Sequence, residues 1–385
     1  FDHQRVALNR CMEILESNES VMLHMPTGSG KTRTALHAVT RFLIPREPCR
    51  ILWLASGKEL CDQAADEFEN AWSFLGNREL ECERFYGSGG TLDIEAEEGI
   101  LVAGLSKLHK WMSRNAEEVP NMARKLDLIV FDEAHQSAAR TYSEVIKNLM
   151  SWNENIRLLG LSATPGRAYL GEGGDADQGL VDIFGGNKVR LDHPDYENAI
   201  QFLIVEEYLS QVTYHEVEYV SGSMDQDRAH EVRGEVAETF NIPESFLEEL
   251  GLNAERNLKI VDTVLEITEQ HDRVLVFSSS VESARLLSQI LRQQGLESYA
   301  IDYKTPSPDR DAHIARFRSN HNGCVVLCNY GVLTTGFDAP QTSAVVIARP
   351  TVSVVLYSQM VGRGIRGPKV GGTPHADIYT VLDTS

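Results

Sequence analysis

The chain has 385 residues, of which 42% are hydrophobic and 24% charged, and its formal net charge is −20 at pH 7. This length fits about two domains, and the composition is that of a globular protein rather than a fibre or a disordered chain. No apolar run approaches the roughly 20 residues that a membrane helix needs, so we expect no membrane segment. The acidity argues against a general nucleic-acid binder, which is expected to be basic.

The first 190 residues alternate strand-like and helix-like stretches. Strands are predicted at the apolar runs 21–25, 51–55, 100–102, 126–131 and 157–161, and helices over 31–43 and through Leu60, Ala64 and Phe68. Strands that are apolar throughout and alternate with helices are typical of a parallel sheet covered on both faces. Residues 1–190 therefore predict one α/β domain.

The same pattern starts again near residue 256. Helices are predicted over 257–270, over 281–294 and from Ser307-Pro308 onward, and strands at 273–277, 299–303, 324–328, 344–348 and 378–382. Proline at the first helical position supports the third helix, because its missing N–H would have no intrahelical partner there. Residues 256–385 therefore predict a second α/β domain of similar design.

The segment 191–255 between these domains is strongly acidic. It holds 16 acidic and 2 basic residues, whereas residues 256–385 hold 13 basic and 12 acidic ones. We expect an acidic linker or insertion with short helices, and both a solvated surface and a docking surface for a protein partner remain open for it. Most of the net charge thus belongs to this segment.

The six cysteines lie at positions 11, 49, 61, 82, 324 and 328, with no CxxC pair and no nearby histidine pair at metal-ligand spacing. We therefore expect neither a disulfide framework nor a structural zinc site, and we expect a reducing, cytoplasmic location. Phe1 is not a methionine and Ser385 directly follows a strand-like run, so we expect both ends to belong to a longer chain.

A glycine-rich stretch lies between the first predicted strand and the first predicted long helix. Its residues are Thr27, Gly28, Ser29, Gly30, Lys31 and Thr32. Glycines in this context let backbone N–H groups surround an anion at a helix N-terminus. Lys31 is expected to reach the β- and γ-phosphates of ATP, and Thr32 to ligate Mg²⁺. The strict phosphate-loop motif, G-x-x-x-x-G-K-[ST], begins with a glycine where this chain has Met25. A glycine-rich turn with a surface lysine is the alternative interpretation.

Two carboxylates, Asp132 and Glu133, follow the apolar run 128–131. The carboxyl end of a parallel strand is where open α/β sheets bind their ligands. Asp132 is expected to hold Mg²⁺, directly or through water, and Glu133 to orient and deprotonate the attacking water. Alone, Asp-Glu after a strand is more often the start of a solvated loop, but the upstream phosphate loop favours the catalytic interpretation.

The sequence 132–135 (DEAH) after TGSGKT resembles the DEAH-type superfamily 2 helicases, and the other motifs of that family appear in order. They are 51–63 (ILWLASGKELCDQ), 103–108 (AGLSKL), 162–164 (SAT), 274–280 (VLVFSSS), 333–340 (LTTGFDAP) and 359–366 (QMVGRGIR). The stretches 180–210 and 350–366 are most similar to restriction-enzyme motor subunits, the ResIII-like DNA helicases of type III restriction. The resemblance implies two tandem RecA-like domains, 1–190 and 256–385, joined by the acidic segment, with ATP between them.

The resemblance also implies roles for single residues. Gln4, just before the first helix, resembles the family's adenine-reading glutamine. His135, Ser162 and Thr164 resemble the residues that couple hydrolysis to strand movement. Gly336 and Asp338 belong to one of the two motifs that complete the family's ATP site, and Gln359, Arg363 and Arg366 belong to the other, whose arginines reach the γ-phosphate.

The last motif can also be interpreted from its spacing. Gln359, Arg363 and Arg366 lie at i, i+4 and i+7, so one helical face is predicted to present all three. Two arginines without acidic partners in the stretch suit the spread charge of a phosphate. Gly362 and Gly364 are poor helix formers and indicate a close approach or the end of the helix. A basic helix face in water is the alternative.

Candidates for nucleic-acid contacts are small polar side chains and one lysine at or near the ends of predicted strands. They are Ser56, Lys58, Ser106, Ser278, Ser279, Thr334 and Thr335. Hydroxyls and backbone amides at such places contact phosphates without reading sequence. Each one alone is more often a loop or cap residue, and only the resemblance favours a role in binding. Because this track has few positive charges, we expect a shallower salt dependence than for a basic protein.

The function that follows is an ATP-dependent helicase or translocase, with DNA favoured over RNA through the resemblance alone. An ATP-gated nucleic-acid clamp or sensor that does not unwind is one alternative. A motor subunit of a restriction or defence complex, whose partner performs the chemistry, is the other. The expected cofactors are ATP and Mg²⁺.

Overall fold

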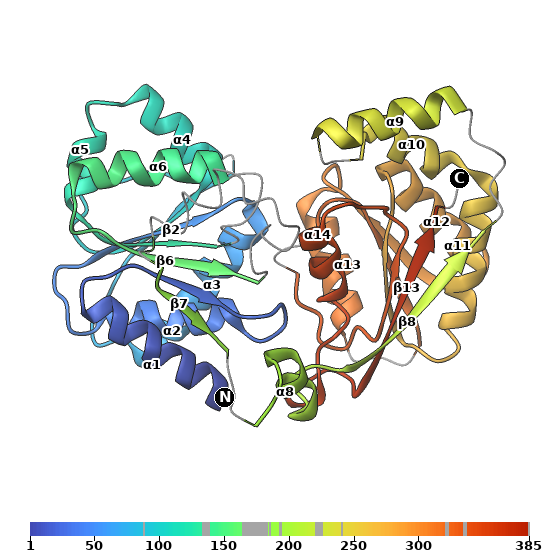
Figure 1. The fold of residues 1–385 in the computed structure, drawn as a ribbon, viewed down its shortest axis with the longest axis horizontal. Helices are drawn as coiled ribbons and strands as arrows, with labels where there is room; N and C mark the ends of the chain where they lie inside the picture. The colour runs from blue at the N-terminus through green and yellow to red at the C-terminus, as the bar shows by residue number, and fades with distance from the viewer. Residues whose placement is uncertain are drawn as a thin grey trace. The chain divides into compact units, whose positions relative to one another are not determined.

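The computed structural model describes residues 1–87, 89–132, 139–163, 184, 186–191, 195–219, 226–239, 242–319, 323–333 and 337–383. They form two compact units, Phe1–Ala199 (unit 1) and Ile200–Ser385 (unit 2), each with its own sheet (Figure 1). The boundary lies inside the acidic segment 191–255, and most of that segment belongs to unit 2 rather than to a separate linker. Unit 2 therefore contains 25 acidic and 15 basic residues.

Unit 1 contains a sheet of seven strands, within the described residues, in the order β3-β4-β2-β5-β6-β1-β7. The strands are β1 (Val21–His24), β2 (Arg50–Ala55), β3 (Cys82–Phe85), β4 (Gly99–Gly104), β5 (Leu126–Phe131), β6 (Arg157–Ser162) and β7 (Lys188–Arg190). All neighbouring strands are parallel, so they all end at one edge of the sheet, the carboxyl edge of unit 1. The inner strand β2 is buried along its whole length, as a strand covered on both faces must be.

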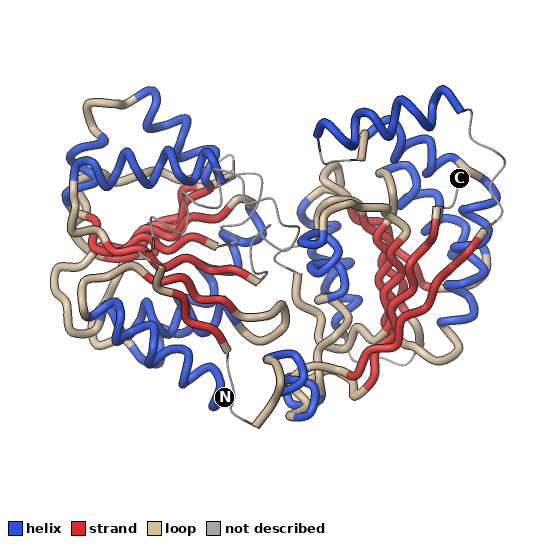
Figure 2. Tube along the Cα trace, in the orientation of Figure 1, coloured by secondary structure: helices blue, strands red, loops and turns tan. Residues whose placement is uncertain are grey.

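Helices cover both faces of this sheet (Figures 1 and 2). On one face, α1 (Asp2–Glu16), α2 (Lys31–Leu43) and α3 (Lys58–Leu75) pack in a row, and on the other lie α4 (Leu105–Arg114), α5 (Val119–Arg124) and α6 (Ala139–Trp152). The core beneath the second group includes Leu54, Leu108, Tyr142 and Ile146. Unit 1 is therefore a doubly wound α/β domain.

Unit 2 repeats this architecture with a parallel sheet of six described strands in the order β10-β11-β9-β12-β13-β8. The strands are β8 (Gln211–Glu218), β9 (Arg273–Phe277), β10 (Glu297–Ile301), β11 (Val325–Asn329), β12 (Ala344–Ile347) and β13 (His375–Leu382). All pairs are again parallel and define the carboxyl edge of unit 2. The strand β8 comes from the acidic segment, which is therefore built into this sheet.

The helices of unit 2 also lie on both faces of its sheet. They are α8 (Ala199–Val205), α9 (Gln226–Thr239), α10 (Glu244–Leu252), α11 (Ala254–Ile267), α12 (Val281–Gln293), α13 (Ser307–Arg318) and α14 (Val354–Val361), with a 3₁₀ turn, η2 (Pro368–Val370). One core joins the sheet to α11 and α12 through residues such as Val264 and Leu287. The other joins it to α13 and α14 through Phe317 and Met360.

The predicted fold class is confirmed, because each half of the chain is a parallel α/β unit. Helix α2 and strand β9 begin and end at the predicted residues. The edge strands β3 and β7 and the helix α1 were not expected. Both strands are short and mostly exposed or half-buried, so neither has the continuous apolar run by which the other strands were predicted.

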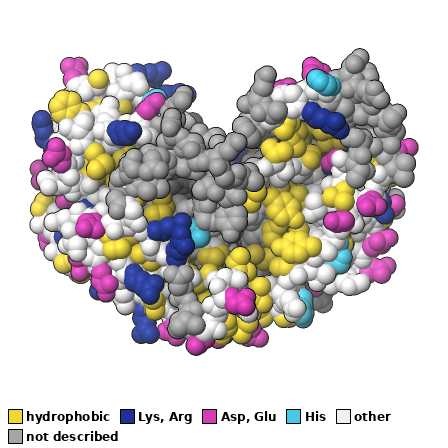
Figure 3. Space-filling model, in the orientation of Figure 1, with side chains coloured by type: hydrophobic (Ala, Val, Ile, Leu, Met, Phe, Trp, Pro, Cys, Tyr) yellow, Lys and Arg dark blue, Asp and Glu magenta, His cyan; other side chains and the backbone are white. Residues whose placement is uncertain are grey.

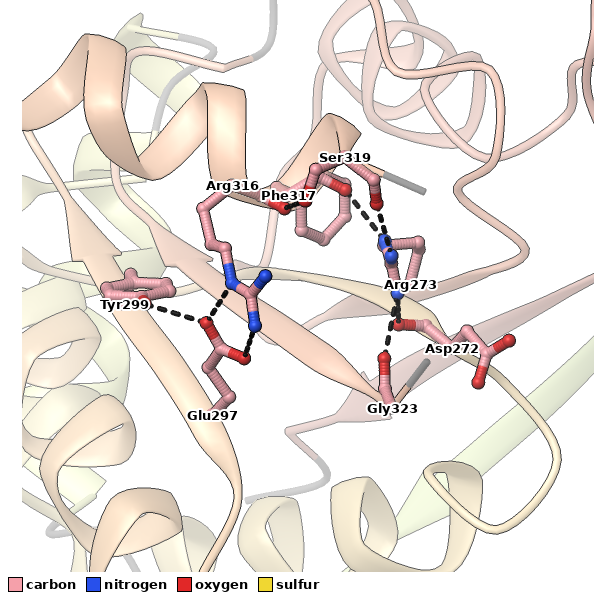
Figure 4. Close-up of polar contacts among 8 residues, drawn as sticks. All are labelled: Asp272, Arg273, Glu297, Tyr299, Arg316, Phe317, Ser319 and Gly323. Atoms are coloured by element: carbon pink, nitrogen blue, oxygen red, sulfur yellow. Dashed lines mark hydrogen bonds and ion pairs between the residues drawn. The ribbon is translucent and has the colours of Figure 1, made fainter. Parts of the chain in front are cut away.

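A buried arginine at the start of β9 holds the loop beyond α13 (Figure 4). The guanidinium of Arg273 donates to the backbone oxygens of Phe317, Asp272, Gly323 and Ser319, at 2.6 to 2.9 Å. Orphan carbonyls at a helix C-terminus need such donors. The figure also shows a second pair nearby, in which the Arg316 guanidinium binds Glu297 at 2.5 and 2.6 Å near the surface.

The described surfaces of the two units differ in charge. Acidic and basic side chains are interspersed on the face of unit 1 in Figure 3, whereas acidic ones prevail on the face of unit 2. Apolar side chains also gather on unit 2 in this view, and its exposed large apolar residues include Tyr214, Val352 and Val354. Within the described ranges, no helix is both long and apolar enough to cross a membrane.

Candidate functional site

The turn between β1 and α2 has the backbone of an anion-binding loop. Gly28 and Gly30 have φ of +88° and +84°, which side chains with a Cβ rarely adopt. Ser29 closes the turn, because its N–H and its Oγ both donate to the Pro26 oxygen, at 3.1 and 2.7 Å. No described side chain caps α2 at Gly30, and the N-terminus of a helix is a place where backbone N–H groups can bind an anion.

Helix α1 supports this loop from the side. Gln4 lies within the first turn of α1 rather than before a helix, which corrects the expectation for its position. Its Nε2 donates to the Ser29 oxygen at 3.1 Å, and His3 Nε2 lies at the same distance from that oxygen. Burial lowers the pKa of His3, although its contact with Ser29 raises it. Gln4 is thus fixed beside the loop, as a residue that contacts a bound nucleotide must be.

The phosphate loop and Asp132 meet at the carboxyl edge of unit 1 because of the strand order. Strand β6 lies between β1 and β5, so Met25, Ser162 and Asp132 follow or end three neighbouring strands. Met25 N donates to the Ser162 oxygen at 3.1 Å. Lys31 Nζ lies 3.7 Å from Asp132 Oδ1, and only 9% and 3% of these two side chains are exposed. A lysine and a carboxylate about 100 residues apart in sequence are thereby paired next to the loop.

The backbone of Asp132 is held on both sides. Its N–H donates to the Leu54 oxygen of β2 at 3.0 Å, and its own oxygen accepts the Tyr142 hydroxyl of α6 at 3.0 Å. The remaining predicted residues of this motif, Glu133 and His135, lie outside the described residues, as does Thr164.

The donors at this edge fit a magnesium ion shared with phosphates. Asp132 offers a carboxylate and Thr32 a hydroxyl, the hard oxygen ligands that Mg²⁺ prefers. In the described part of the chain, no group of three or more His, Cys, Asp or Glu side chains could hold a metal. A site with one carboxylate and one hydroxyl agrees with Mg²⁺ bound largely through nucleotide oxygens and water.

In unit 2, the predicted helical face of Gln359, Arg363 and Arg366 is wrong. Helix α14 ends at Val361 with Gly362 at its C-cap, so only Gln359 lies in the helix. Beyond the helix, Gly364 lies close to β12, because a Cβ there would lie 2.5 Å from Val345 Cγ2. Gly362 thus caps the end of the helix, as its low helix propensity indicated.

The two arginines still lie close to the other motif of the predicted site. Arg363 donates to the Phe337 oxygen, and Arg366 Nε lies 3.3 Å from Asp338 Oδ1. The backbone of Arg366 forms an isolated antiparallel β-bridge with Leu209, just before β8. The side chain of Gln359 is buried, with 5% of the residue exposed. Tertiary folding therefore brings Asp338 and both arginines together, although no helix aligns them. Gly336, Thr334 and Thr335 lie outside the described residues.

The predicted nucleic-acid residues of unit 1 are on its surface. Ser56 and Ser106 follow the adjacent strands β2 and β4 and are exposed, and Lys58 is 54% exposed and pairs with Asp62 at 3.2 Å. Lys107, beside Ser106, lies 4.3 Å from the centre of the Phe85 ring. These side chains form a polar strip along one part of the carboxyl edge of unit 1.

The predicted nucleic-acid residues of unit 2 are inside it. Ser278 and Ser279 follow β9 and are 0% exposed. The sequence also missed two larger side chains at this edge, Tyr330 after β11 and Arg349 after β12. The Arg349 guanidinium lies 4.9 Å from the centre of the Tyr330 ring. The rule used for the serines, a polar residue at or near the end of a predicted strand, would have identified both.

Two family models match the chain. The model described as "Type III restriction enzyme, res subunit" matches residues 1–167, and the "Helicase conserved C-terminal domain" matches residues 256–367. The first covers the phosphate loop and Asp132, and the second covers Arg363 and Arg366.

Curated relatives are similar over most of the chain. A 51.5 kDa protein of Lactococcus phage (isolate 7-9) is 25% identical over 348 residues, which cover 90% of this chain and 62% of the phage protein. The type I restriction enzyme EcoKI endonuclease subunit of Escherichia coli (strain K12) is 25% identical over 417 aligned positions, which cover 96% of this chain and 34% of that subunit. The chain thus spans less than two thirds of the length of these relatives.

Solved structures share the fold of both units. The DUF1998 helicase MrfA bound to DNA superposes with a TM-score of 0.69 at 14% identity, over all of this chain and 49% of MrfA. Dbp5 of S. cerevisiae bound to RNA and ADP BeF3 gives a TM-score of 0.63 at 17% identity, over 95% of this chain and 80% of Dbp5. At these identities the similarity shows the fold alone.

Proposed function

Because the chain carries the two domains of a superfamily 2 helicase core, the first of them ResIII-like, we propose that it is an ATP-dependent DNA helicase or translocase. The observation that supports this most is the convergence of Lys31 and Asp132 at the N-terminus of α2. A loop of left-handed glycines, a buried lysine and a carboxylate are what binding and hydrolysis of a nucleoside triphosphate require.

Each residue of unit 1 has a proposed role in that reaction. The loop amides and Lys31 bind the β- and γ-phosphates, and Gln4 recognises the base beside the loop. Thr32 and Asp132 hold Mg²⁺, which neutralises charge on the β- and γ-phosphate oxygens when bound. Glu133 accepts the proton of the attacking water, and His135, Ser162 and Thr164 couple the reaction to nucleic-acid movement. These assignments rest on the motif resemblance and on the geometry around Lys31.

Unit 2 supplies the positive charge in this proposal. Arg363 and Arg366 stabilise the charge that develops on the transferred γ-phosphate, with Gln359, Gly336 and Asp338 in the same site. An arginine in this role increases the rate by about 10³- to 10⁵-fold. Arg366 is paired with Asp338 in this structure, so its engagement with a nucleotide requires that ion pair to exchange for a phosphate.

The proposed substrate is a nucleic-acid strand, which binds through polar groups at the ends of β-strands. Ser56, Lys58 and Ser106 are exposed where such contacts need them. DNA is favoured by the similarity to restriction-enzyme subunits. The acidic part of unit 2 is proposed as the surface for any protein partner.

The test is an ATPase assay with duplex DNA, single-stranded DNA and duplex RNA side by side. Lys31→Ala should reduce hydrolysis at least about 100-fold, because a positioned charge at the phosphates is lost. Lys147→Ala, which removes an exposed lysine of α6, is the matched control and should hydrolyse ATP normally. Hydrolysis by Lys31→Ala at the rate of the parent protein would contradict the site, and no stimulation by any strand would contradict the motor.

Strand displacement then separates the motor from a clamp. A translocase should displace a third strand from a triplex at a rate that follows its ATP hydrolysis. A clamp or sensor should hydrolyse ATP on DNA without displacing anything. A motor subunit that needs its partner should displace a strand only when that partner is added.

A further inference from the structure

Helix α10 lies against the carboxyl edge of the unit 2 sheet. In Figure 1 it sits at the end toward which the strand arrows of this unit point. Its last turn packs on the serines after β9, since a Cβ at Gly251 would lie 2.7 Å from Ser280 Oγ and 3.2 Å from Ser279 Oγ. Asn257 Nδ2 of α11 donates to the Gly251 oxygen at 2.8 Å and holds this turn in place.

Several serine hydroxyls under this helix have no polar partner among the described residues. The Oγ atoms of Ser278, Ser279 and Ser283 are buried without a hydrogen bond to any described residue, as is Asn257 Oδ1. Buried hydroxyls without a partner cost free energy, so native structures have few of them. The hydroxyls of Ser278 and Ser279, at the end of β9, are therefore able to accept a polar partner if the helix above them moves.

The first turn of α10 holds the neighbouring strand end. Glu244 Oε1 accepts the Tyr330 hydroxyl at 3.3 Å, and the Arg349 guanidinium lies 4.9 Å from the Tyr330 ring centre. Strands β11 and β12 flank β9 in the sheet, so Tyr330, Ser279 and Arg349 follow three adjacent strands. Burial raises the pKa of Tyr330, the positive charge of Arg349 lowers that pKa, and the carboxylate of Glu244 raises it. Tyr330 is therefore influenced by both the cation and the carboxylate.

Helix α10 is acidic and shallowly anchored. It carries Glu244, Glu248 and Glu249 and no basic residue. The first two are exposed, and Glu249 binds Arg228 of α9 at 2.6 Å. Leu247 and Leu250 are the buried apolar side chains of α10, fewer than α12 buries on the sheet. A nucleic-acid backbone approaching this edge would meet carboxylates first.

We propose that α10 is a built-in competitor of the nucleic-acid strand at this edge. In the state seen here it covers Ser279 and holds Tyr330 next to Arg349. Binding of a strand displaces the helix, frees the serine hydroxyls and lets Arg349 exchange its acidic neighbour for a phosphate. This inference rests on the proposed function, and it adds a regulation of the same nucleic-acid site.

A reversible disulfide tests the displacement directly. The variant Gly251→Cys/Ser280→Cys places two thiols where a Cβ would lie 2.7 Å from the partner Oγ, which is compatible with disulfide geometry. Burial raises the pKa of Cys82 and Cys324 to about 12, so these native cysteines, both half-buried, compete poorly. Single-stranded DNA should bind the oxidised variant at least about tenfold more weakly than the reduced one. Equal binding by both forms would overturn the proposal.

A charge-matched pair of substitutions tests the competition without a cross-link. Glu244→Gln keeps an oxygen for the Tyr330 hydroxyl and removes only the charge, whereas Glu269→Gln removes the same charge at an exposed site after α11. At low salt, Glu244→Gln should bind single-stranded DNA about two- to fivefold more tightly than Glu269→Gln, and high salt should reduce the difference. Identical affinities at low salt would refute the role of Glu244.

The outcomes also separate this inference from the proposed function. If the parent protein binds DNA and all variants bind it equally, only the role of α10 fails. If no form, reduced or oxidised, binds any strand while all still bind ATP, the proposed nucleic-acid motor fails, and the competition fails with it.

Discussion

Replacing Gly30 with alanine tests the geometry of the phosphate loop most directly. Gly30 has φ of +84° and is the N-cap of α2. A Cβ at this position would overlap Gln4 Nε2 and lie 3.2 Å from Gln4 Cδ. The substitution therefore strains the backbone and pushes Gln4 away from the loop.

Two costs add in this variant. A residue with a Cβ in the left-handed region costs about 1–2 kcal/mol, and the lost hydrogen bond from Gln4 Nε2 to the Ser29 oxygen about 1 kcal/mol. We expect the free energy of unfolding of unit 1 to fall by about 2–3 kcal/mol. In a Gln4→Ala background the overlapping atom and its hydrogen bond are already absent, so Gly30→Ala should then cost only about 1–2 kcal/mol.

Urea unfolding followed by tryptophan fluorescence measures this cost in unit 1. All four tryptophans, Trp53, Trp72, Trp111 and Trp152, lie in that unit. Gly89→Ala is the control, because a Cβ there meets nothing within 4 Å, and its stability should change by less than about 0.5 kcal/mol. An equal cost of Gly30→Ala in both backgrounds would show that Gln4 does not lie on the loop, and no cost in either would refute the left-handed turn.

Two further predictions concern unit 2, and hydrogen exchange of its strands measures both. Arg273→Met should destabilise this unit by about 3 kcal/mol or more, because four backbone oxygens lose a buried charged donor (Figure 4). Arg316→Met, which breaks a partly exposed pair with Glu297, should destabilise the unit much less, and equal costs would refute the anchoring role of Arg273. Burial lowers the pKa of His271, although Asp377 beside this histidine raises that pKa. The unfolded chain therefore binds more protons than the folded one, and unit 2 should lose stability as pH falls from about 7 to about 5. His271→Gln should reduce this slope, and an unchanged slope would show that another group causes it.

The elements best predicted from the sequence are those at the centres of the two sheets. β2, β5 and β9 are buried on both faces and therefore appear as continuous apolar runs. The strand β8 was not predicted because it lies at the sheet edge and its exposure alternates, so its apolar residues are isolated. Whether such a segment is a strand depends on pairing with β13, about 160 residues away in the chain.

The nucleotide-binding half of the site was the most predictable part of its chemistry. The loop residues and Asp132 each follow an apolar strand, and parallel strands must end at one edge. The unit 2 half was less predictable. The spacing of Gln359, Arg363 and Arg366 suggested one helical face, but the helix ends at Val361, and Gly364 beyond it packs against Val345. Close approach between a glycine and a distant strand leaves no periodic signal.

The local pattern of residues was sufficient for the α/β class, the phosphate loop and the position of Asp132, because all three depend on neighbours in sequence. Only the tertiary structure decided that Lys31 meets Asp132, since that contact depends on β6 inserting between β1 and β5. It also decided that the acidic segment belongs to unit 2 and that α10 buries the serines after β9. Those outcomes depend on contacts between residues far apart in the chain, which composition and spacing do not encode.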